Sequence, residues 1–161
     1  MSSPPLLQRS VVLLALGLAA LPGGASAQTN PRTPYWASIK SSEATMRRGP
    51  SRDMRAMWTY RRPGLPVQVV AVMEDWRQVR EPDGTIGWMH RSLLSGRGTA
   101  IVVGSVQPMR TRPDPTAGIA WRAAPGVVGT IERCDDGWCL LDVTGRRGWV
   151  ARAGLWGAVE E

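Results

Sequence analysis

The sequence contains the same pattern of residues twice. One copy begins with MRRGP at position 46 and ends in GWMHRSLL, and the other begins with MRTRP at position 109 and ends in GWVARAGL. Equivalent landmarks are spaced almost constantly, by 62 positions for Pro63-Gly64 and Pro125-Gly126, 62 for Trp76 and Trp138, and 61 for Gly87-Trp88 and Gly148-Trp149. The one-residue difference indicates that one hairpin loop differs in length between the copies. Self-similarity of this kind predicts two copies of one structural unit.

Short apolar segments separated by strong turn signals fill both copies. The expected strands are Pro66–Met73, Trp76–Arg80 and Thr85–Met89 in the first copy, and Val127–Cys134, Trp138–Val143 and Arg147–Val150 in the second. Turns at intervals of about eight to twelve residues favour an all-β barrel or sandwich. A single helical or 3-10 turn is expected within Trp88–Leu94 and again within Trp149–Leu155. The joint between the copies, Gly96-Arg97-Gly98, is so short that the two units are expected to lie close together.

The N-terminal residues have the composition of an export signal. Arg9 precedes an apolar run of eleven residues, Val11–Leu21, which is too short to serve comfortably as a membrane anchor. Ala25-Ser26-Ala27 predicts cleavage after Ala27. No cysteine follows this point and only one arginine precedes the run, so neither a lipoprotein anchor nor a twin-arginine signal is expected. We expect export to the periplasm without a transmembrane anchor; secretion and a buried N-terminal helix are the alternatives.

The charge of the chain restricts the classes of partner. Loss of Arg9 with the signal leaves 19 of the 20 basic residues against 13 acidic ones, a net charge of +6. Such a field attracts polyanions, which for an exported protein are cell-wall polymers, lipopolysaccharide or acidic protein surfaces, and not nucleic acid. Solubility alone is the alternative explanation. The chain has eight Trp and no Phe, so large aromatic side chains are expected to form much of the core.

Cys134 and Cys139 flank the turn sequence Asp-Asp-Gly. A hairpin turn there would bring the two strand positions side by side, and an oxidising compartment would allow a disulfide between them. Two cysteines do not supply the four ligands of a structural metal site, and their spacing differs from C-x-x-C, so neither a metal site nor a redox role is expected. The small loop should stabilise the protein by less than the roughly 3 kcal/mol of a 15-residue loop.

Two motifs identify the family that the sequence resembles. The segment Met46–Ser51 (MRRGPS) resembles the opening of bacterial SH3-like (SH3b) domains, and Gly87-Trp88 and Gly148-Trp149 resemble the GWV signature near their end. The resemblance covers nearly all of Ile39–Gly157. The sequence is similar to the periplasmic branch of this family, whose members are stand-alone proteins with tandem domains. The second copy departs from it at Arg110–Pro113, where no glycine precedes the proline.

The resemblance implies small barrels of five to seven strands, with the tryptophan of each Gly-Trp packed under the long loop near the start of the domain. Many members bind cell-wall peptides, and others bind proteins. We therefore expect an all-β protein with a cleaved signal peptide (residues 1–27), an extended segment (28–37) and two tandem SH3-like barrels (38–97 and 98–161).

No set of catalytic groups is recognisable, and no cofactor is expected. The one histidine, His90, is far in sequence from both cysteines, and a Cys-His unit also needs a third group that orients the base. Two acidic pairs, Glu74-Asp75 and Asp135-Asp136, occupy matching hairpins. Such a pair can act in glycoside hydrolysis, but Asp also favours tight turns, and the turn interpretation is preferred.

Residues that recur in both copies are assigned to packing. They are Trp76, Trp88, Trp138, Trp149, Gly87 and Gly148. Trp58 and Tyr60 lack a clear repeat, although Trp121 loosely corresponds to Trp58, and they precede Arg61-Arg62.

Aromatic faces can stack on a ligand while arginines clamp carboxylates. The predicted ligand-binding rim comprises Trp58, Tyr60, Arg61, Arg62, Arg47 and Arg48. Packing of Trp58 and Tyr60 between the barrels, and a solvated rim of arginines, are the alternatives. The function expected is a non-catalytic exported module that binds peptidoglycan or its stem peptides; the alternative is a protein-protein interaction module of the cell envelope without glycan affinity.

Overall fold

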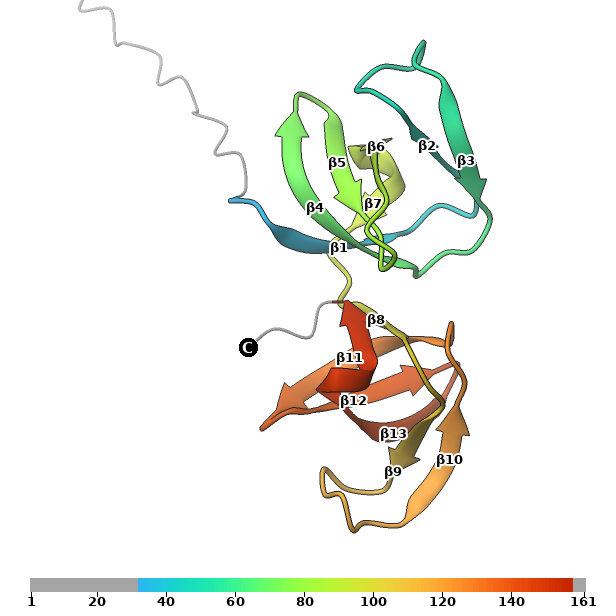
Figure 1. Cartoon of the computed structure of the whole chain (residues 1–161), viewed down its shortest axis with the longest axis vertical. Coiled ribbons are helices and arrows are strands. Elements are labelled where there is room, and N and C mark those ends of the chain that lie inside the picture. The colour runs from blue at the N-terminus through green and yellow to red at the C-terminus, as the bar shows by residue number, and fades with distance from the viewer. Residues whose placement is uncertain (1–31, 158–161) are drawn as a thin grey trace, which may run out of the picture.

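Short strands and tight turns produce two antiparallel sheets in the computed structural model, which describes residues 32–157 (Figure 1). The first comprises β1 (Tyr35–Ile39), β2 (Ala44–Arg47), β3 (Ala56–Tyr60), β4 (Pro66–Met73), β5 (Trp76–Arg80), β6 (Ile86–His90) and β7 (Leu94–Ser95). The second comprises β8 (Thr99–Val102), β9 (Gln107–Arg110), β10 (Ile119–Ala123), β11 (Val128–Asp135), β12 (Trp138–Val143), β13 (Arg146–Ala151) and β14 (Leu155–Gly157). The predicted all-β class is confirmed.

Strand order is the same in the two sheets. It runs β3-β2-β6-β5-β4-β1-β7 in the first and β10-β9-β13-β12-β11-β8-β14 in the second. The outermost strands of each sheet are not paired with each other in this order, so each domain is a curved, open barrel. The two expected single turns are present as 3-10 helices, η1 (Arg91–Leu93) and η2 (Arg152–Gly154).

Alternation along the strands places one set of side chains in each core. On β2, Ala44 and Met46 are buried, whereas Thr45 and Arg47 remain partly exposed. The largest fully buried side chains belong to Ile, Met, Leu and Val, and Trp149 is the only described tryptophan in the buried set, at 8% exposure. The expectation that large aromatic residues form much of the core is therefore wrong. Aliphatic and methionine side chains fill most of it, while the described tryptophans other than Trp149 remain at least partly exposed.

The hairpins account for the one-residue difference between the repeats. Glu74-Asp75 and Asp136-Gly137 each join two paired strands, which confirms the turn interpretation for Glu74, Asp75 and Asp136; Asp135 is the last residue of β11 and is paired with Trp138. In the second of these turns both residues have positive φ, 41° and 78°, as a type I′ turn requires. Strands β5 and β6 are joined by residues 81–85, but β12 and β13 are joined by residues 144–145 alone.

The predicted disulfide is present between strands β11 and β12. Cys134 and Cys139 are direct partners in the strand register, with their Cα atoms 4.1 Å apart. Cys139 is buried in the second core, so the bond ties that core to the hairpin.

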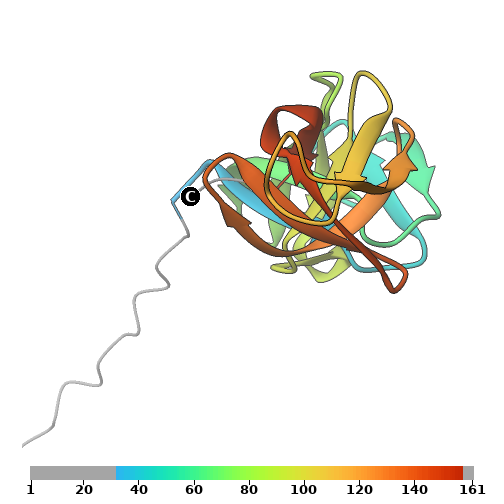
Figure 2. The ribbon, with the colours of Figure 1, turned by 90° about the horizontal axis from the view of Figure 1, so that it is seen from below.

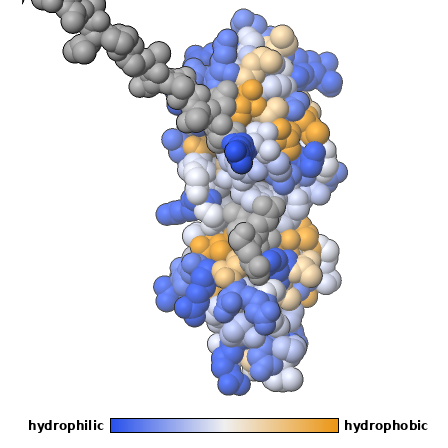
Figure 3. Space-filling view, turned by 90° about the vertical axis from the view of Figure 1, so that its left-hand side faces the viewer, coloured by the Kyte–Doolittle hydropathy of each residue, from blue (hydrophilic) through white to orange (hydrophobic). Residues whose placement is uncertain are grey.

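The two domains are stacked along the long axis of the molecule, and they overlap when seen along it (Figure 2). At the junction Trp36 of β1 meets Trp156 of β14 edge to face, with ring centroids 4.8 Å apart. Arg62 donates a hydrogen bond from Nη1 to the carbonyl oxygen of Gly126 at 2.9 Å. The close placement expected from the short joint is thus observed, and the tryptophan pair of the junction is Trp36 and Trp156. Hydrophilic side chains predominate on the face shown in Figure 3.

Close approach of β13 to β9 requires a glycine at position 148. A Cβ atom there would lie 2.6 Å from Cβ of Met109 and 3.3 Å from its backbone. We predict that Gly148→Ala lowers the free energy of unfolding by about 1–3 kcal/mol, because overpacking displaces side chains and backbone. Urea denaturation measures this change. Gly96→Ala is the matched control, since a Cβ there would meet nothing within 4 Å; an equal loss in both variants would contradict the packing argument.

Candidate functional site

A groove of about 430 Å³ lies on the first domain beside β2, β5 and η1. Trp76 at the start of β5 and His90 at the end of β6 are direct partners in the register, and both line the groove. Thr45 and Arg47 enter it from β2, because alternation turns them away from the core. Its remaining wall is formed by Glu43, Arg52, Ser92 and Leu93.

Contacts among neighbouring residues fix the positions of the Trp76 and His90 rings in the groove. The rings of Trp76 and His90 are edge to face with centroids 5.5 Å apart. Nδ1 of His90 accepts the backbone N–H of Ser92 at 3.3 Å and lies 2.7 Å from the Ser92 hydroxyl oxygen. Because Nδ1 accepts, the neutral ring carries its hydrogen on Nε2. This arrangement caps η1 and fixes the imidazole beside the indole.

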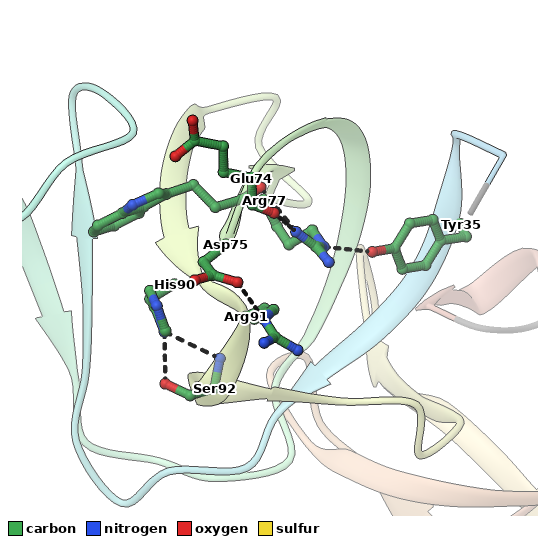
Figure 4. A network of polar contacts seen from close by, with 8 residues as sticks. Tyr35, Glu74, Asp75, Arg77, His90, Arg91 and Ser92 are labelled. Atoms are coloured by element: carbon green, nitrogen blue, oxygen red, sulfur yellow. Dashed lines mark hydrogen bonds and ion pairs between the residues drawn. The ribbon is translucent and has the colours of Figure 1, made fainter. Parts of the chain in front are cut away.

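The hairpin that carries Trp76 is braced by arginines, as Figure 4 shows. Arg91 forms an ion pair with Asp75, with 2.6 Å between Nε and Oδ1. Arg77 donates to the Tyr35 hydroxyl at 3.0 Å and to the Glu74 carbonyl oxygen at 2.9 Å. Exposed ion pairs of this kind contribute at most about 1 kcal/mol to stability, so their main effect is to orient the hairpin.

The polar rim of the groove combines two guanidinium groups with one carboxylate. Arg47 donates from Nη1 to the carbonyl oxygen of Met54 at 2.9 Å, which anchors the loop that bears Arg52. Glu43 supplies the single negative charge. A groove lined by one indole and two arginines suits a ligand that has carboxylates and an apolar surface. Among the described residues, the hydrogen-bond partner of the His90 ring is Ser92.

The six residues of the predicted rim do not form one surface. Arg47 lines the groove, whereas Arg48 is exposed outside its lining. Trp58 and Tyr60 are paired with Met46 and Ala44, and therefore lie on the opposite side of the β2–β3 ribbon from Arg47. Arg61 is exposed just beyond β3, and Arg62 reaches the second domain.

Trp58 and Tyr60 belong instead to a polar cluster with Glu81. The indole N–H of Trp58 donates to the Tyr60 hydroxyl, and their rings are 6.3 Å apart. The Glu81 side chain lies close enough to the Tyr60 hydroxyl for each group to shift the pKa of the other. Burial, and then the Glu81 carboxylate, raise the pKa of Tyr60. Burial raises the pKa of Glu81, with a further contribution from the charge of nearby Asp83.

Sequence reasoning did not assign Trp76 to a groove because Trp76 recurs as Trp138. The residues near the two tryptophans in the structure differ between the domains, and this difference indicates the groove. Trp138 is paired with Ala151 where Trp76 is paired with His90, and η2 has Ala153 where η1 has Ser92. These two positions beside the recurring tryptophan are thus polar in the first domain and alanine in the second.

The other recurring residues differ in exposure. Trp88 and Trp138 are partly exposed, Trp149 is buried, and the two glycines are buried beneath methionines, Gly87 under Met46 and Gly148 under Met109. Trp121 is paired with Met109 as Trp58 is with Met46, so it is the structural counterpart of Trp58. Its indole N–H donates to the Arg147 carbonyl oxygen at 3.0 Å, and the Arg146 guanidinium lies 4.8 Å from its ring centroid.

The model of one protein family, described as "Bacterial SH3 domain", matches residues 40–96 and 103–157. These two segments cover most of the chain. The chain belongs to the bacterial SH3 domain family. The expected tandem of SH3-like domains is therefore confirmed, with one match on each sheet. The family is generally one of binding modules, often directed at cell walls.

Solved structures that resemble this tandem SH3 protein include NlpC1 and NlpC2 from Trichomonas vaginalis. They are 15% and 13% identical to it, with a TM-score of 0.36 in each case. The alignments cover 81% and 79% of this chain but 48% and 49% of the two NlpC chains, so the SH3 protein spans about half of their length. No curated protein matches the sequence.

Over residues 32–157, no group of three or more His, Cys, Asp or Glu side chains is placed to hold a metal ion. In the same part of the chain, no helix has the length and apolar character needed to cross a membrane. The predicted signal peptide, with cleavage after Ala27, lies outside the described residues.

The raised pKa of Glu81 makes stability depend on pH in a defined direction. The folded state holds this proton more tightly than the unfolded state, so the stability contributed by Glu81 falls as pH rises from 4.5 through the raised value. We predict that Glu81→Gln increases the free energy of unfolding at pH 7 by less than about 1 kcal/mol, since Glu81 is partly exposed. The gain should disappear near pH 3.

Asp83 provides a control of opposite sign. The backbone N–H of Thr85 donates to its carboxylate at 2.9 Å and lowers its pKa. Asp83→Asn should therefore reduce stability at pH 7, with the loss shrinking as the pH falls. Urea denaturation at several pH values measures both effects, and a pH-independent change in the Glu81 variant would contradict the assignment.

Proposed function

We propose that this protein is a non-catalytic binding module of the bacterial cell envelope that recognises peptidoglycan through its stem peptides. The observation that carries the proposal is the groove that the Trp76 indole lines together with the imidazole of His90 and the side chains of Arg47 and Arg52. Membership of the bacterial SH3 domain family supports a binding role.

The chemistry of the groove fits such a ligand. Stem peptides carry free carboxylates, which arginine binds with paired, charge-assisted hydrogen bonds. They also carry amines, for which Glu43 is the available partner, and adjoining sugars present apolar faces that can stack on Trp76. Because the protein is basic, its field attracts the acidic wall polymer before the specific contacts form.

The proposed site is in the first domain. The second domain keeps the tryptophan as Trp138 but has alanine in place of His90 and of Ser92. In this proposal the second domain extends the surface and stabilises the first through the junction, and it does not provide an equivalent groove.

The proposed location is the periplasm, reached through the signal peptide predicted at residues 1–27. The disulfide between Cys134 and Cys139 supports an oxidising compartment outside the cytosol.

The decisive test is co-sedimentation of residues 28–161 with purified peptidoglycan at low salt and at about 0.15 M salt, where charges are screened beyond roughly 8 Å. We predict that the wild type pellets under both conditions, because stacking on Trp76 survives screening. Arg52→Ala should weaken binding about tenfold by removing a charge-assisted hydrogen bond. Trp76→Ala should weaken it at least as much.

Each variant has a matched control within the chain. Arg48→Ala removes the same charge from the same loop but outside the groove, and should change affinity by less than about twofold. Trp138→Ala removes the equivalent tryptophan of the second domain and controls for general destabilisation. Equal losses in a variant and its control would contradict the groove. Failure of the wild type to pellet would favour the protein-protein interaction module instead.

A further inference from the structure

A second cavity lies at the junction of the two domains. It has a volume of about 280 Å³, and its walls include Ile39, Leu65 and Val67 of the first domain and Ile101 of the second. The Tyr60 and Glu81 side chains line it as well, and Asp83 lies at the same wall. Apart from these groups its lining is apolar, and it shares no lining residue with the Trp76 groove.

Glu81 has no cationic partner within the described residues. The ion pairs found there join Arg91 to Asp75 and Arg147 to Glu132. Besides burial, the groups that shift the pKa of Glu81 are the Tyr60 hydroxyl and the negatively charged Asp83. A half-buried carboxylate beside another acid, in a chain with 20 basic residues, is therefore left uncompensated. A bound cation would supply the missing charge.

The fold does not require these polar groups. Ala123, paired with Gln107, occupies the position of Tyr60, which is paired with Ala44. Counted from Trp138 and Trp76, Val143 stands where Glu81 stands. The loop of residues 81–85 is replaced by the two-residue turn 144–145. The second domain completes the same sheet without the polar cluster, so the cluster is a feature added to the first domain at a cost in stability.

The shape and charge of the cavity define its occupant. Its volume accommodates one large side chain, and its apolar walls favour an aliphatic or aromatic group. The acidic wall favours a positive charge next to that group. We propose that this cavity is a second binding site, and that it takes a polypeptide segment presenting an apolar side chain beside an amine or guanidinium group. This partner differs in charge from the acidic ligand proposed for the Trp76 groove, so the two proposals stand separately.

Three tetrapeptide probes test the proposal on ¹⁵N-labelled protein comprising residues 28–161. They are acetyl-Gly-Phe-Lys-Gly-amide, the same peptide with acetyl-lysine, and the same peptide with glutamate. The lysine peptide should shift the amide resonances of Tyr60, Glu81, Asp83 and Ile101. Its dissociation constant should be at least about tenfold lower than that of the acetyl-lysine peptide, a difference of about 1.4 kcal/mol. The glutamate peptide should not shift these resonances.

The Glu81→Gln variant should bind the lysine and acetyl-lysine peptides with affinities within about twofold of each other. Glu74→Gln removes a carboxylate from an exposed turn of the same domain and should keep the preference for lysine. Equal binding of the lysine and acetyl-lysine peptides by the wild type overturns the proposal, and so does the absence of shifts at this cavity. Neither outcome depends on a variant, so loss of folding in Glu81→Gln would not obscure the result.

Discussion

The close contact between a methionine on one strand and a glycine on its neighbour determines much of this fold. Met46 of β2 lies over Gly87 of β6, and Met109 of β9 lies over Gly148 of β13. Absence of a side chain at the glycine lets the first hairpin fold back across the sheet, which curves around a small aliphatic core. The same contact determines which residues face outward. Because Met46 points into the core, Thr45 and Arg47 point away from it and line the groove that Trp76 also lines.

Duplication makes the special residues of each domain visible. Core positions, turns and the Gly-Trp pair are retained in both sheets, as a shared fold requires. Against that background, His90, Tyr60 and Glu81 stand out because alanine or valine replaces them in the second domain. A comparison of the two domains therefore separates residues that the fold requires from residues that the fold does not require. In the second domain, two tryptophans have arginine neighbours. The Arg133 guanidinium lies over the Trp149 ring, and that of Arg146 lies over the Trp121 ring.

The pattern of strands, turns and cysteines was predictable from sequence because each depends on local chemistry. Acidic and glycine turns, β-branched runs and the Cys134–Cys139 spacing all act over a few residues. The arrangement of the site was less accessible. Trp58 and Arg47 are close in sequence, but strand pairing places them on opposite sides of a ribbon. Trp76 was assigned to packing because it recurs, and only the pairing of β5 with β6 brings His90 beside it. The prediction of the core from composition was also wrong, because eight tryptophans suggested an aromatic interior and the structure has a mainly aliphatic one.

The meeting of Trp36 with Trp156 joins the first strand of the first domain to the last strand of the second. The two ends of the described chain therefore approach the waist of the molecule, and not its tips (Figure 1). A tag or further domain fused directly before residue 32 or directly after residue 157 would emerge beside the junction and leave both distal ends of the rod unobstructed. For immobilisation on a surface, attachment at residue 32 or residue 157 would hold the molecule by its middle, with its two ends directed away from the point of attachment.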